Sequence, residues 1–96
     1  MGKKPSEHKT LYEVLREGGM DEEISQRTLR VAVDMSNMHR PGTLSEIMRE
    51  VDCSRKKTYT LPDVIDSLRI LEIYGYAAFN LQGKYYLTEK GEQGFK

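Results

Sequence analysis

The sequence predicts a mainly helical α+β fold, in which a three-helix core carries a β-hairpin and an extra N-terminal helix precedes the core. Three observations predict it: helix-start signals recur, apolar residues follow at helical spacing, and the last part of the chain changes to β-prone runs. The 96 residues fit one domain, because compact domains most often contain about 100–150 residues. We expect residues 1–9, which are polar and aperiodic, to be a flexible tail, and residues 10–96 to form the single domain.

Helix starts are marked by a threonine that is followed three residues later by an acid. The pairs are Thr10 with Glu13, Thr43 with Glu46, and Thr60 with Asp63. In such a pair the hydroxyl accepts a hydrogen bond from a free backbone amide, and the acid lies near the positive end of the helix. The strict capping box requires Glu or Gln, so the third pair is the weakest match. Each signal predicts where a helix begins.

The first predicted helix covers residues 11–17 and ends at Gly18-Gly19, which favour helix termination. The second begins after an Asp21 cap and continues to about Met38. Its apolar stripe recurs at spacings of three and four residues, as expected for a helix with one buried face. The stripe residues are Ile24, Thr28, Val31, Met35 and Met38.

The third predicted helix is short and covers residues 44–51, and the fourth covers residues 62–74. A proline in the first turn and a glycine after the last turn suit the ends of this fourth helix. The β-prone runs 76–81 and 84–87 then flank Gln82-Gly83, which predicts a hairpin. A helical stub is expected to close the chain.

The formal charges cancel, with 15 basic and 15 acidic residues, although nucleic-acid-binding domains are usually basic. The charges are unevenly distributed along the chain. Residues 53–62 contain Arg55, Lys56 and Lys57 and no acid, whereas residues 10–24 are predominantly acidic. A neutral total can therefore accompany a basic edge.

The remaining composition argues against several classes of protein. The only cysteine, Cys53, cannot form an internal disulfide, and no Cys/His cluster has zinc spacing. No apolar run approaches the roughly 18 residues of a membrane span. We therefore expect a cytoplasmic protein without a metal or cofactor. Neither histidine has an obvious catalytic partner and no phosphate-binding loop or paired-carboxylate motif occurs, so we expect no enzymatic activity.

The end of the fourth helix and the hairpin carry a resemblance to a known family. The segments are Leu68-x-x-Leu71-Glu72-x-x-Gly75-Tyr76 and Gly83-Lys84-Tyr85-Tyr86-Leu87-Thr88-Glu89-Lys90-Gly91. A short helix, a turn, a longer helix with this ending and then a hairpin resemble the winged helix-turn-helix of MarR- and PadR-type transcription factors, over about residues 21–94. The resemblance implies that helix 62–74 enters the major groove while the hairpin touches the adjacent minor groove or phosphates. The implied function is sequence-specific binding of double-stranded DNA by a small transcriptional regulator.

This chain departs from that family in two places. The turn from Asp52 to Leu61 is about six residues longer than the usual tight turn. In addition, we expect Asp63, Asp66, Ser67 and Ile70 on the outward side of helix 62–74, and two carboxylates there would repel phosphates.

DNA contacts are therefore expected mainly from the long turn and the hairpin tip. The predicted DNA-contacting residues are Arg55, Lys56, Lys57, Thr58, Tyr59, Ser67, Asn80, Gln82 and Lys84. Asn80, Gln82 and Lys84 are equally compatible with a turn-forming role. Arg69 is expected to pair with Asp66 or Glu72 instead of contacting DNA.

A homodimer is also expected, because many winged-helix regulators dimerise through helices outside the DNA-binding motif. The candidate interface residues are Leu11, Tyr12, Leu15, Ile73 and Tyr74. The alternative is that helix 11–17 packs only on its own domain.

Three other activities compete with DNA binding. The main one is a winged-helix protein-interaction module without DNA binding, which zero net charge would permit. The others are sensing of oxidants by Cys53, which lies close in sequence to the cations Arg55 and Lys56, and binding of a small effector, for which no sequence motif marks a pocket.

Overall fold

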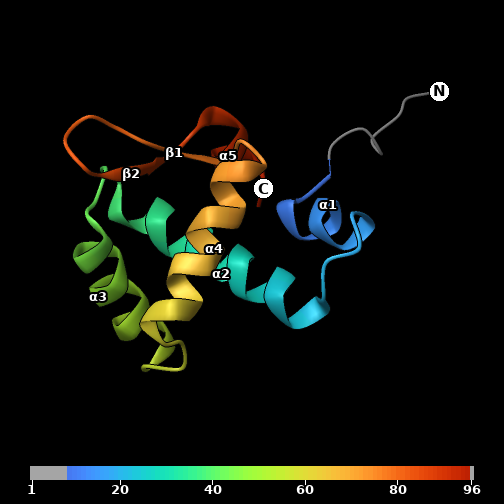
Figure 1. The fold of residues 1–96 in the computed structure, drawn as a ribbon, viewed down its shortest axis with the longest axis horizontal. Helices are drawn as coiled ribbons and strands as arrows, with labels where there is room; N and C mark the ends of the chain where they lie inside the picture. Colours follow the sequence, from blue (N-terminus) through green and yellow to red (C-terminus); the bar gives the residue numbers. More distant parts are fainter. Residues whose placement is uncertain (1–8, 96) are drawn as a thin grey trace.

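The computed structural model describes residues 9–95, and most of the predicted tail lies outside this range. Lys9, the described tail residue, forms an ion pair with Glu17 at 2.7 Å between Nζ and Oε1. The elements are α1 (Leu11–Glu17), α2 (Glu22–Met38), α3 (Leu44–Arg55), α4 (Leu61–Ile73), β1 (Ala77–Phe79), β2 (Tyr85–Leu87) and α5 (Glu89–Gln93). The prediction of a mainly helical α+β fold is confirmed (Figure 1).

All three predicted capping boxes form. The backbone amides of Glu13, Glu46 and Asp63 donate to the hydroxyl of the threonine three residues earlier, at 3.1, 3.2 and 3.4 Å. The longest of these belongs to the pair with Asp, which was the weakest match. Each acid also accepts from the amide of its capping threonine. Short-range side-chain chemistry therefore decides where α1, α3 and α4 begin.

α3 is longer than predicted. It continues past residue 51 to Arg55, so the turn between α3 and α4 contains only residues 56–60 and the prediction of a turn from Asp52 to Leu61 is wrong. Residues 52–55 contain no glycine or proline to stop the helix. The helix stops instead before Lys56, whose backbone is left-handed, with φ 54° and ψ 44°.

The hairpin is antiparallel, with Ala77 opposite Leu87 and Phe79 opposite Tyr85. A third piece of extended chain joins it, because Gly42, between α2 and α3, exchanges backbone hydrogen bonds with Tyr85 at 3.0 and 2.7 Å. This bridge ties the start of α3 to the hairpin. Figure 1 shows the hairpin above α3 and the middle of α2, with α1 at the far side of the molecule.

One cluster of buried apolar side chains joins α1, α2, α3, α4 and β1. Its members are Leu11, Leu15, Val31, Ala32, Met35, Ile47, Val51, Val64, Leu68, Leu71, Tyr76 and Ala77. α4 packs across α2 in the centre of this cluster (Figure 1). Within residues 9–95, the helices are too short or too polar to cross a bilayer.

Candidate nucleic-acid interface

Arg55, a predicted phosphate contact, is held inside the domain. Its guanidinium donates to both carboxylate oxygens of Asp34 on α2, at 3.2 and 3.0 Å, and to the carbonyl oxygen of Arg30 at 3.4 Å. Asp34 is 1% exposed. Burial raises the pKa of the Asp34 carboxyl, and the hydrogen bonds and charge of Arg55 oppose this shift. Removing Arg55 from Asp34 would leave a buried carboxylate unpaired, so the pair argues against the predicted role of Arg55 as a phosphate ligand.

Lys56 and Lys57 lie on the surface of the turn between α3 and α4. Both side chains are exposed, and neither forms an ion pair with another residue of the described chain. Both have a left-handed backbone, with φ of 54° and 61°, which costs a residue with a side chain about 1–2 kcal/mol. The turn therefore exposes two adjacent positive charges, and both residues adopt an unfavourable backbone conformation.

The other two predicted turn contacts are partly used within the domain. The Thr58 hydroxyl donates to the carbonyl oxygen of Arg55, and the Tyr59 hydroxyl accepts from the guanidinium of Arg30 at 3.2 Å. The Tyr59 ring is half-buried and packs against the core. Thr58 remains exposed, so it is the more accessible of the two.

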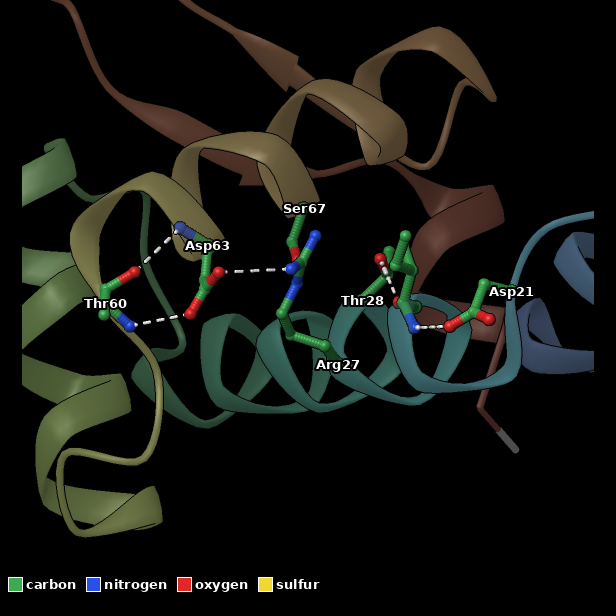
Figure 2. Close-up of polar contacts among 7 residues, drawn as sticks. Asp21, Arg27, Thr28, Thr60, Asp63 and Ser67 are labelled. Atoms are coloured by element: carbon green, nitrogen blue, oxygen red, sulfur yellow. Dashed lines mark hydrogen bonds and ion pairs between the residues drawn. The ribbon is translucent and has the colours of Figure 1, made fainter.

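Of the residues predicted on the outward side of α4, Asp66 is exposed, whereas Asp63 and Ser67 face α2. Ser67 is fully buried, and its hydroxyl accepts from Nε of Arg27 at 2.8 Å. The same guanidinium pairs with Asp63 at 3.3 Å, as Figure 2 shows. Hydrogen bonds from Thr60 lower the pKa of the Asp63 carboxyl, and Arg27 adds to this effect. Ile70 packs against the core.

Ser67 therefore cannot reach DNA, and its prediction as a contact is wrong because α4 crosses α2 on that side. The exposed side of α4 includes Asp66, as predicted, together with Pro62, Arg69 and Glu72. Arg69 forms none of the ion pairs found within residues 9–95, so the predicted pairing with Asp66 or Glu72 is also wrong. Arg69 is thus an exposed cation on α4, although the sequence predicted an ion pair for it.

The hairpin tip is organised by Asn80. Its side-chain oxygen accepts from the backbone amides of Gln82 and Lys84, at 2.9 and 3.0 Å. Asn80 therefore has the turn-forming role that the sequence also allows. Gln82 is exposed and Lys84 is half-buried, so these two can still face a ligand. Leu81, which follows Asn80 in the same loop, is fully exposed.

The turn and the hairpin tip lie at opposite ends of α3. Gly42 places the hairpin beside the start of α3, whereas Lys56 and Lys57 follow its last residue (Figure 1). The 12 residues of α3 span about 18 Å at a rise of about 1.5 Å per residue. This exceeds the roughly 12 Å width of a major groove. The turn and the hairpin are therefore separated by about the length of α3.

Two of the predicted dimer-interface residues are internal. Leu11 and Leu15 are fully buried in the core of their own domain, so they have no surface to offer a second copy and this part of the prediction is wrong. Tyr12 is half-buried, and Ile73 is 74% exposed. The Tyr74 ring stacks against Tyr76 with centroids 6.3 Å apart.

Two hollows on the surface had no signal in the sequence. One, of about 590 Å³, lies between the end of α2, β2 and Glu92 of α5. The other, of about 590 Å³, follows the outer side of α3 and includes Cys53 and Lys57. The first hollow is assembled from segments far apart in the sequence, whereas the second is lined mainly by α3.

Comparison of the chain with models of protein families, with curated proteins and with solved structures found no match. The functional argument therefore depends on the geometry of this chain.

Proposed function

We propose that this chain is a winged-helix domain that binds double-stranded DNA and acts as a small transcriptional regulator. The observation that carries the proposal is the order of elements around α4. α3 and a short turn precede α4, a hairpin follows it, and Gly42 joins that hairpin to the segment before α3. This order suits a helix that enters the major groove with a hairpin beside it.

The proposed contacts are fewer than the sequence predicted. Lys56 and Lys57 would bind phosphates on one side of α4, and Gln82 and Lys84 would contact the backbone on the other side. Arg69, exposed on α4, would reach toward the groove between them. We further propose that two copies bind two half-sites in the cytoplasm, with Ile73 as the most exposed of the candidate interface residues.

Fluorescence anisotropy with labelled duplexes at increasing salt tests the proposal. Each phosphate contact contributes about 0.9 to the slope of log affinity against log salt. The double variant Lys56→Ala/Lys57→Ala should bind more weakly at low salt, with a slope shallower by about 1.8. The matched control is Lys9→Ala/Arg16→Ala, which removes the same net charge at α1, on the far side of the molecule (Figure 1). Equal losses for both pairs, or no binding by the wild type at low salt, would refute the proposal.

A protein-interaction module is the second candidate, and one observation favours it. Large apolar side chains are exposed on α4 and on the hairpin, where Ile73, Phe79 and Leu81 are 74%, 53% and fully exposed. The acids Asp66 and Glu72 on α4 are also exposed. Such a surface suits a protein partner better than a phosphate backbone. Absence of DNA binding together with reversible self-association that Ile73→Ser abolishes would favour this candidate.

A further inference from the structure

The backbone of the Lys56-Lys57 turn is fixed by several hydrogen bonds. The amides of Lys56 and Lys57 both donate to the carbonyl oxygen of Asp52, the latter at 3.1 Å. The Thr58 amide donates to the carbonyl oxygen of Arg55 at 3.0 Å, and the Thr58 hydroxyl binds the same oxygen. An unfavourable left-handed backbone persists only where its surroundings determine it in this way, and such segments cluster at functional sites.

Every one of these acceptors lies in the last turn of α3, so the direction of the turn depends on how that end of α3 is held. Arg55 holds it, because its guanidinium binds both carboxylate oxygens of Asp34 and the carbonyl oxygen of Arg30. A bidentate pair fixes orientation as well as distance. The Arg55 side chain is 27% exposed and that of Asp34 is 1% exposed, so the pair joins the interior of α2 to the edge of the turn.

We propose that the Asp34–Arg55 pair is a clamp that positions Lys56 and Lys57 for the DNA backbone, and that Arg55 is a positioning residue which makes no phosphate contact. The ligand in this inference rests on the proposed function, whereas the clamp itself does not. The charge of Arg55 is already balanced by Asp34, while Lys56 and Lys57 form no ion pair within residues 9–95. Arg55 thus holds the turn in place, whereas Lys56 and Lys57 bind the DNA backbone.

The two possible roles of Arg55 differ in the salt dependence of DNA binding. If Arg55 positions the lysines, Arg55→Gln lowers affinity about fivefold or more, because two side chains must then become ordered on binding, and the salt slope stays unchanged. If Arg55 binds a phosphate, Arg55→Gln makes the slope shallower by about 0.9. That second result would overturn the inference.

Asp34→Asn separates the same two roles by the sign of its effect and keeps the shape of the side chain. A clamp predicts that Asp34→Asn lowers affinity, as Arg55→Gln does, because the pair loses its charge. A phosphate-binding Arg55 that Asp34 restrains predicts higher affinity and a steeper salt slope. Higher affinity would therefore overturn the inference.

Limited digestion of the native protein with an endoproteinase that cleaves only after lysine gives a readout without DNA. Both variants should be cleaved after Lys56 and Lys57 at least several times faster than the wild type, while cleavage after Lys84 and Lys90 keeps its wild-type rate. Equal acceleration at all four sites would indicate global unfolding, and no acceleration at Lys56 and Lys57 would exclude a clamp; either result overturns the inference. Selective acceleration without any DNA binding by the wild type would support the clamp and refute the proposed function.

Discussion

Replacing Gly91 with alanine should separate α5 from the hairpin. Gly91 is buried where α5 packs against Tyr76, directly before β1, and against Leu87 of β2. An added Cβ would overlap the carbonyl oxygen of Tyr76 and would lie 3.0 Å from its carbonyl carbon and 3.3 Å from Cδ2 of Leu87. The nearest of these atoms belong to the backbone, so no side-chain rotation can relieve the overlap. The same Tyr76 oxygen accepts from the Thr88 amide at 2.9 Å, and movement of α5 would break this bond as well.

The expected loss follows from these two effects. Overpacking of a tight contact costs about 1–3 kcal/mol, and the lost backbone hydrogen bond adds about 1 kcal/mol. The free energy of unfolding of Gly91→Ala should therefore fall by about 2–4 kcal/mol, measured by urea denaturation. Gln93→Ala, an exposed position in the same helix, is the control and should stay within about 0.5 kcal/mol of the wild type. A similarly small change for Gly91→Ala would refute the packing of α5 on Tyr76 and Leu87.

Two further predictions concern the core and pH. Leu68→Ala should lower the free energy of unfolding by about 2–5 kcal/mol in urea denaturation, because Leu68 is 1% exposed in the core; a loss under about 1 kcal/mol would contradict its position. Burial raises the pKa of Asp34, so the folded chain binds its proton more readily than the unfolded chain and acidification stabilises the wild type relative to Asp34→Asn. Hydrogen bonds from Thr60 lower the pKa of Asp63 below its ordinary value of 3.8. The Asp63 carboxylate therefore stabilises the fold fully above pH 3.8, and this stabilisation, measured relative to Asp63→Asn, is lost as the pH falls further. Urea denaturation of all three proteins from neutral to acidic pH checks these signs, and a change in the same direction for both variants would refute them.

Sequence reasoning succeeded where the decisive contacts are short-range. A capping box joins residues three apart, so the starts of α1, α3 and α4 follow from Thr10, Thr43 and Thr60 alone. The hairpin was predicted for the same reason, because Asn80 and the Gln82-Gly83 pair form their turn locally. Such features require no knowledge of the rest of the fold.

The failures concern side chains whose partners lie far away in the sequence. Arg55 pairs across 21 residues, and Ser67 binds Arg27 across 40. A signal was present in both cases. Asp34 occupies the apolar stripe of α2 between Val31 and Met35, and an acid there requires a buried partner. Ser67 similarly falls on the same helical face as the buried positions 64, 68 and 71. The pattern therefore indicated burial, but not which cation each acceptor would bind.

The neutral total charge has a structural origin that leaves room for a basic patch. Helix N-termini favour acids and helix C-termini favour bases, and this chain follows that rule with Asp21, Glu22 and Glu23 at the start of α2 and with residues 55–57 at the end of α3. Figure 1 shows the end of α3 on the left and the start of α2 on the right of the molecule. Capping thus separates the charges in space even though their sum is zero. The electrostatic case for DNA binding consequently depends on this separation, and the salt slope of Lys56→Ala/Lys57→Ala measures it more directly than the net charge does.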